Sequence, residues 1–233
     1  MFCVNCGMAN EGSTLAACVH CGKSNQPVFS AADARRIIQS ASGDAFTAIR
    51  QITSDPIGGL TRSYATLGEE RARAAGIALG VAFALAVGIA SAITASHIGF
   101  NGIAKLLLGM TVVGLVPFAA MAGVSAGARK AFRADGAFGA DLLSCGVALQ
   151  PFSIVFIIAA LLGIANFQTV ALVSLFAWTY MLSILFTGCT QLAHIPQRFA
   201  PTVIAVMLLA AIWATRVVGG WLLSDDPFIR FFN

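Results

Sequence analysis

Five long stretches of apolar and small residues occupy most of the chain after residue 73. They cover residues 74–96, 106–128, 142–165, 170–190 and 202–223. The first has 23 residues and no charged side chain. A helix rises about 1.5 Å per residue, so that length crosses the roughly 30 Å hydrocarbon layer of a bilayer. This stretch also begins too far into the chain for a cleaved signal peptide. The pattern predicts an all-α polytopic membrane protein with five transmembrane helices.

Composition agrees with this fold class, since 58% of the residues are hydrophobic and 10% are charged. In soluble domains about a quarter of the residues are charged. The net charge of +4 is no sign of an anionic partner, because membrane proteins concentrate Lys and Arg on one side for topological reasons.

The distribution of the basic residues predicts the orientation. Most of the 14 Lys and Arg residues precede the first stretch or follow the second and fourth, whereas Lys105 and Arg230 fall on the other side and Arg216 lies inside the last stretch. The positive-inside rule then places the N-terminus in the cytoplasm. We expect a bacterial inner-membrane protein with a short extracytoplasmic tail at residues 224–233.

Residues 1–24 contain two Cys-x-x-Cys pairs, each followed by glycine. The pairs are Cys3 with Cys6 and Cys18 with Cys21. Two residues between thiolates allow one turn to direct both sulfurs at a single ion, and two such turns complete a tetrahedral site. A redox dithiol needs one pair rather than two. We predict a structural Zn²⁺ site whose binding energy, about 10–16 kcal/mol in small peptides, orders this segment. Its thiolates require the reducing cytosol.

Nucleic-acid binding is not expected of this segment. Glu11 and Lys23 are the charged residues of positions 1–24. A site that holds phosphates needs a cluster of basic side chains.

Residues 25–73 form a predicted cytosolic linker with two amphipathic segments. In the first, apolar residues recur at helical spacing, namely Ala34, Ile37, Ile38, Ala41, Ala45, Ala48, Ile49 and Ile52. The charged residues Arg35, Arg36, Asp44 and Arg50 mostly fall off this stripe. Such a helix lies either on the membrane surface or against a partner or another copy of the chain. The second segment, with Ile57, Leu60, Tyr64 and Leu67 before Gly68, is predicted to lie in the membrane interface.

Small residues repeat every four positions in the first two spans. The residues are Gly76, Gly80, Ala84 and Gly88 in the first span, and Gly123 and Gly127 in the second. Small side chains at this interval allow helix backbones to approach closely. We expect the first stripe to form the central packing seam, and either stripe could also support oligomerisation.

Few polar groups fall within the spans, and no Asp, Glu or His lies in the middle of one. Pro117 and Pro151 should bend their helices. Gln150 either satisfies a carbonyl that the proline frees or lines a small polar cavity. Two interpretations of Arg216 are open. Either its long side chain reaches along the helix to the outer membrane surface, or the helix ends near Thr215 and Arg216 lies beyond it. Asp141 can cap a helix start.

Cys189 and His194 are the residues that a membrane-embedded Cys/His enzyme would use. The sequence offers no third group to orient them. Buried free cysteines at Cys145 and Cys189 are the favoured interpretation, and no catalytic residue is assigned.

Two parts of the sequence resemble known protein families. The motifs FCVNCG and CVHCG resemble the short zinc ribbon found at the N-termini of many bacterial membrane proteins. The runs DPIGGLTRSYATLG, RADGAFGADLL and CGVALQPFSIVFIIAALLG resemble the Yip/Yif family of five-span membrane proteins. This resemblance implies five spans and a cytosolic N-terminus. Eukaryotic relatives bind prenylated small GTPases, but the chain lacks their longer signatures, so that partner is not carried over.

These observations predict a non-enzymatic membrane protein. Its zinc ribbon and amphipathic helix would act as a membrane-organising or docking platform for an unidentified cytosolic or membrane protein, in a homo- or hetero-oligomer surrounded by lipid. One alternative is a small-solute transporter or channel with a pathway around Pro117, Gln150 and Pro151. The weaker alternative is the Cys/His enzyme.

Overall fold

The computed structural model describes residues 42–52, 55, 58–97, 102–162 and 167–223. The chain divides after Ser40, and all of these residues belong to the unit 41–233. The predicted zinc ribbon and the tail at residues 224–233 lie outside the described residues.

The described part of the chain folds into helices. They are α2 (Gly58–His97), α3 (Ile103–Ala131), α4 (Phe138–Leu162), α5 (Phe167–Thr187), the short π-helix η2 (Gly188–Leu192) and α6 (Ala200–Leu223). Within the described residues, five helical segments are long and apolar enough to cross a membrane. For the described residues, the predicted all-α fold with five helices long enough to be spans is thereby confirmed, and the chain is a multi-pass membrane protein. Residues 42–52 form one further helical segment, here called the arm helix.

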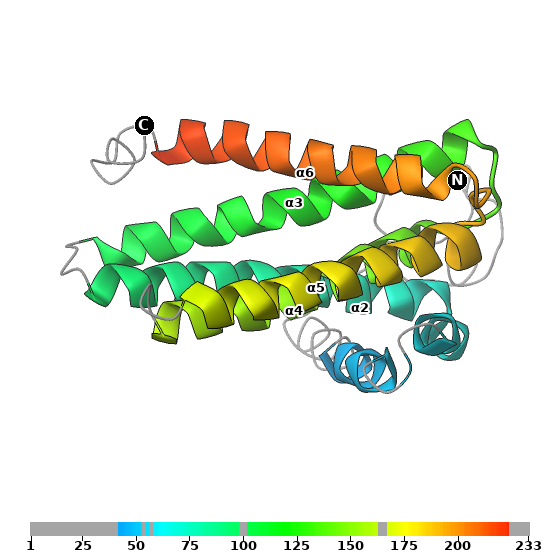
Figure 1. The fold of residues 1–233 in the computed structure, drawn as a ribbon. Coiled ribbons are helices and arrows are strands. Elements are labelled where there is room, and N and C mark those ends of the chain that lie inside the picture. Colours follow the sequence, from blue (N-terminus) through cyan, green and yellow to red (C-terminus); the bar gives the residue numbers. More distant parts are fainter. Residues whose placement is uncertain (1–41, 53–54, 56–57, 98–101, 163–166, 224–233) are drawn as a thin grey trace, which may run out of the picture. The chain divides into compact units, whose positions relative to one another are not determined.

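Helix α2 changes direction at Gly68, whose backbone has φ 71° and ψ 174°. Residues with a Cβ adopt such a positive φ at a cost, so glycine is the suitable residue here. The helix begins where the Asp55 carboxylate accepts a hydrogen bond of 2.9 Å from the Gly58 N–H. Its first part, residues 58–67, is the segment that the sequence predicted in the interface. In Figure 1 this part and the arm helix (blue) run across the long helices rather than along them.

Helix α2 is the centre of the bundle. It packs on α3 and on α4, while α6 packs on α3 and α5 packs on α4; helices α5 and α6 touch each other very little (Figure 1). The largest fully buried side chains include Leu60, Leu79, Met121, Leu143 and Ile184. They belong to one apolar cluster that extends through α2, α3, α4 and α5.

Large apolar side chains also cover the outside of the long helices. Leu172, Trp213 and Trp221 are 69%, 69% and 80% exposed. In water such a surface would drive aggregation, whereas in a bilayer it faces acyl chains as apolar as itself.

One end of the bundle collects the basic residues and is here called the basic side. It holds the starts of α2, α4 and α6 and the ends of α3 and η2 (Figure 1). The described cations on this side include Arg62, Arg71, Arg73, Arg129, Lys130, Arg133 and Arg198. Lys105 lies at the start of α3, at the opposite end.

Candidate functional site

The small residues of α2 are packed against α4 and α3. A Cβ placed on Gly76 would lie 2.5 Å from the carbonyl carbon of Leu142, so the α2 and α4 backbones are nearly in contact there. Ala84 faces Gly114 of α3. A Cβ placed on Gly114 would lie 2.9 Å from the Cα of Ala84, so α2 and α3 also approach closely there. Gly80 and Gly88 lie against Phe118 and Thr111. The first stripe is therefore used inside the chain.

The second stripe lies elsewhere. Within the described residues, no heavy atom comes within 4 Å of a Cβ built on Gly123 or Gly127. Both glycines lie on the exposed face of α3. This face does not contribute to packing within the bundle.

The arm helix is fixed to the bundle by two side-chain pairs. The Arg71 guanidinium donates to both carboxylate oxygens of Asp44, with Nε 2.8 Å from Oδ2. Ser63 Oγ donates a hydrogen bond of 2.7 Å to Oε1 of Gln51. Each pair joins the arm helix to a different part of α2, one before and one after the bend at Gly68.

A third contact reaches the end of the arm helix from α5. The Tyr180 hydroxyl lies 3.2 Å from the carbonyl oxygen of Ile52, to which it donates. The apolar face of the arm, with Ala45, Ala48 and Ile52 all nearly inaccessible, is turned inward, while Phe46 is 70% exposed.

The described part of the amphipathic helix packs on its own bundle, a contact that the sequence did not predict. Its predicted position on a membrane surface or against a partner stays a prediction. Asp44 is an exception among the charged residues that mostly fall off the apolar stripe: it is 9% exposed because its carboxylate faces Arg71. The outward face, with Phe46 and Arg50, stays available to the membrane interface.

A cavity of about 390 Å³ lies between the arm helix, α4 and α5 and is here called the arm cavity. It is lined by Ile49, Ile52, Val147, Gln150, Pro151, Ile154, Phe176 and Tyr180. Gln150 Nε2 donates to the carbonyl oxygens of Leu79, at 2.8 Å, and Gly146, at 3.2 Å. Gln150 thus ties α4 to α2 and lines a cavity, but neither acceptor is the Val147 carbonyl, which Pro151 leaves without its usual donor.

A second cavity, of about 590 Å³, separates α5 from α6. It is lined by Leu182, Ser183, Phe186, Thr187, Thr190, Gln191, Gln197, Pro201 and Ile204. The three hydroxyls each donate to the carbonyl oxygen four residues earlier in the chain. Thr61 donates a hydrogen bond of 2.8 Å to Oε1 of Gln191, which links α2 to η2 at the mouth of the cavity.

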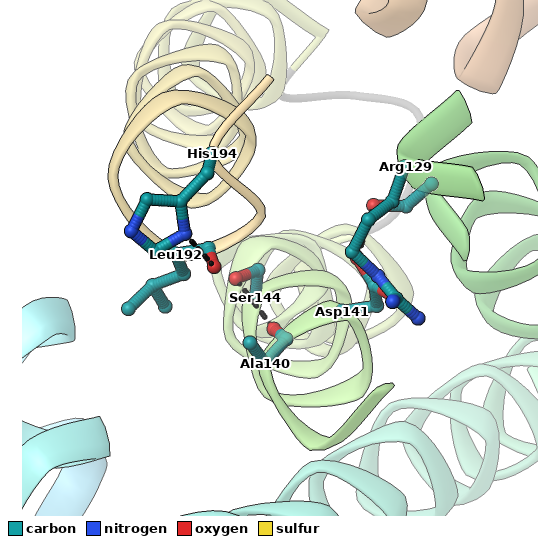
Figure 2. A network of polar contacts seen from close by, with 7 residues as sticks. Arg129, Ala140, Asp141, Ser144, Leu192 and His194 are labelled. Carbon is teal, nitrogen blue, oxygen red and sulfur yellow. Dashed lines mark hydrogen bonds and ion pairs between the residues drawn. The ribbon is translucent and has the colours of Figure 1, made fainter. Parts of the chain in front are cut away.

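A buried ion pair joins the end of α3 to the start of α4. Arg129 Nε lies 3.0 Å from Oδ2 of Asp141, and Ser125 Oγ donates to Oδ1 at 2.7 Å. The Asp141 side chain is 0% exposed and that of Arg129 is 14% exposed. Figure 2 shows Arg129 turned toward Asp141. The carboxylate also lies in the first turn of α4, where the helix dipole favours negative charge.

Sequence reasoning foresaw the position of Asp141 at a helix start but missed its partners. A signal was present: Ser125 and Arg129 are four residues apart on one face of α3, and a short connection leads from them to Asp141. The charge distribution includes Arg129 only as one of the basic residues that predict the orientation.

The remaining predicted residues lie on η2, in the loop that follows it, on α3 and on α6. Cys189 is 3% exposed, while the ring Nδ1 of His194 lies 3.0 Å from the carbonyl oxygen of Leu192 (Figure 2). Pro117 lies inside α3 and lines neither cavity. Arg216 is exposed on α6, which continues to Leu223, so the interpretation that the helix ends near Thr215 is wrong.

The zinc ligands Cys3, Cys6, Cys18 and Cys21 lie outside the described residues. Within the part that the structure describes, no group of three or more His, Cys, Asp or Glu side chains is placed to hold a metal ion. The zinc site stays a prediction.

Comparison with protein-family models, curated proteins and solved structures found no match to this chain. The resemblance to the Yip/Yif family also stays a prediction. The arm helix, its three polar contacts with the bundle and the arm cavity are the candidate functional site.

Proposed function

We propose that this protein is a non-enzymatic membrane subunit that presents a zinc-bound N-terminal segment, and that this segment docks a partner protein. The observation that carries the proposal is the attachment of the arm helix through Asp44, Gln51 and Ile52. The arm helix, which follows the predicted zinc ribbon in the sequence, is thereby fixed to the bundle.

The connection in the sequence supports a docking role. Residues 25–41 separate the predicted ribbon from the arm helix. A partner bound by the ribbon would therefore be tethered to the membrane bundle through the chain itself.

A non-enzymatic role is supported by the polar groups of the bundle. Asp141 is engaged by Arg129 and Ser125, Gln150 by two backbone carbonyls, and Cys145 and Cys189 are buried. The contacts of Asp141 and Gln150 join helices to one another. The basic side agrees with a bacterial inner membrane protein whose N-terminus is cytoplasmic.

The test uses the full chain in native membranes, with a photo-crosslinking amino acid in place of Val28. Wild type is expected to contain one zinc ion per chain and to capture a defined set of proteins. Replacing Cys3 and Cys6 by Ser should abolish both zinc content, measured by mass spectrometry of the metal, and capture. The matched control replaces Cys145 and Cys189 by Ser and should retain both. Capture that persists without zinc would contradict the docking role.

A small-solute transporter is the second candidate, favoured by the cavity between α5 and α6. Its hydroxyl and amide side chains line a space that begins at the basic side and descends along α5. Gln150→Leu would be an ambiguous probe of transport, because it also breaks the hydrogen bond to Leu79. Solute flux in reconstituted vesicles that depends on Ser183 and Thr190 would favour this candidate.

A further inference from the structure

The arm cavity is continuous with the outer surface that faces lipid. Two of its lining residues, Ile154 on α4 and Phe176 on α5, are 60% and 69% exposed. Both belong to membrane-spanning helices, so the surface around them borders acyl chains. The cavity therefore opens sideways into the region that lipid tails occupy.

The cavity offers apolar surface to whatever enters it. Its two polar side chains already donate hydrogen bonds, Gln150 to Leu79 and Gly146 and Tyr180 to Ile52. The other lining residues are Ile, Val, Pro and Phe. Water is poorly held in such a space, because each molecule needs two to four polar partners.

The arm helix closes the cavity on one side. Ile49 and Ile52 form part of the lining, and the contacts of Asp44 and Gln51 hold this helix in place. Its other face exposes Phe46 and Arg50, an apolar and a cationic side chain that suit a position among headgroups. The volume of about 390 Å³ falls within the range of pockets that hold small apolar ligands.

We propose that the arm cavity binds one acyl chain of a membrane phospholipid, drawn from the leaflet that borders the arm helix. Continuity with the lipid-facing surface selects this occupant, since acyl chains already surround the opening. Lipid binding and docking of the arm helix are then coupled, because the chain contacts both the arm and the bundle. The proposal does not depend on the zinc ribbon or on its partner.

The experiment uses the full chain in vesicles of phosphatidylethanolamine and phosphatidylglycerol. A fraction of the phosphatidylglycerol carries a photoactivatable diazirine at the end of one acyl chain. After irradiation, mass spectrometry of peptides compares labelling of residues 147–154 with that of residues 209–216 on α6, which are equally part of a span. We expect labelling to be concentrated on residues 147–154 and on the arm helix.

Two matched variants localise the label. Ile154→Trp fills the opening, and Ile212→Trp makes the same change at an α6 residue that is also 60% exposed. Since blocking the cavity removes contacts with several methylene groups, labelling at residues 147–153 should fall by about tenfold in Ile154→Trp and stay unchanged in Ile212→Trp.

Two results would overturn the proposal. One is wild-type labelling of residues 147–154 no stronger than that of residues 209–216, which would mean that lipid only surrounds the bundle. The other is labelling that Ile154→Trp leaves unchanged. The wild-type comparison decides by itself, so the test holds even if the variant does not fold.

Discussion

At the scale of single residues, the ion pair between Arg129 and Asp141 should matter most for stability. Asp141 is fully buried, so removing its partner leaves a charge without compensation in the bundle. We expect Arg129→Met to lower the free energy of unfolding by about 3–5 kcal/mol. The double variant Arg129→Met/Asp141→Leu should recover most of this loss, because it removes both charges. Denaturant titration of the purified protein in detergent measures the difference.

The pair between Arg71 and Asp44 provides the control for this experiment. It has the same chemistry, but the Arg71 side chain is 62% exposed. Water can replace the lost contact, so Arg71→Met should destabilise the protein far less than Arg129→Met does. If the two single variants lowered the free energy of unfolding equally, burial of Asp141 would not be what determines the loss of stability.

At the scale of elements, the contact between α2 and α4 depends on glycine. A Cβ on Gly76 would lie 2.5 Å from the Leu142 backbone, and backbone atoms cannot move aside as a flexible side chain can. Gly76→Ala should therefore force the two helices apart and cost about 1–3 kcal/mol of stability. The midpoint of thermal unfolding in detergent, with size-exclusion profiles to confirm folding, reports the change.

Gly127→Ala is the matched variant for Gly76→Ala. It makes the same substitution within a membrane-spanning helix, at a position with no heavy atom within 4 Å in the described structure. Alanine favours a helix more than glycine does, so the unfolding midpoint should stay the same or rise slightly. A loss of stability as large as that of Gly76→Ala would contradict the distinction between the two stripes. If Gly127→Ala instead changed the oligomeric state, the second stripe would be a contact between copies.

The elements themselves were predictable because their signals are local. A stretch without charges and of sufficient length predicts a span, and the apolar repeat that ends at Gly68 predicted the first part of α2, before its bend. The docking of the arm helix was not predictable. Periodicity shows that a helix has an apolar face but not what covers that face, and the charge of Asp44 suggested an outward position until its partner Arg71 was known.

Less of the candidate site was predictable, because the sequence shows unusual residues but not the partners that they contact. Gln150 and Pro151 were identified as unusual residues within a span, and both line the arm cavity. Tyr180 and Ser63 were missed, because a hydroxyl on an apolar helix carries no sequence signal for its acceptor. The clearest motif, the four cysteines, falls on residues outside those described.

At the scale of the whole molecule, the bundle consists of helix pairs joined by α2. The pairs α3 with α6 and α4 with α5 each pack closely, but α5 and α6 meet at few points and leave a cavity between them. The arm helix lies against α2 and α5 and borders the arm cavity with α4. The two cavities are therefore distinct, and variants in one should leave ligands of the other unaffected.

The orientation of the bundle in the membrane is a property of the whole molecule that a single experiment can test. The basic side should face the cytoplasm. Arg198→Cys places a thiol on that side, and Lys105→Cys places one at the opposite end of the spans; both residues are exposed. A membrane-impermeant maleimide added to intact bacterial cells should label Lys105→Cys. It should label Arg198→Cys only after the membrane is permeabilised.

Peptide mass spectrometry separates these labels from those on native cysteines. Cys145 and Cys189 are 1% and 3% exposed and should react only after denaturation, so they report whether the bundle is intact. Labelling of Arg198→Cys in intact cells would reverse the orientation. Because the five spans alternate and the arm helix is attached at the basic side, it would also place the four N-terminal cysteines outside the cytoplasm. There, oxidation to disulfides competes with zinc binding, so the zinc ribbon and the cytosolic docking role would both be lost.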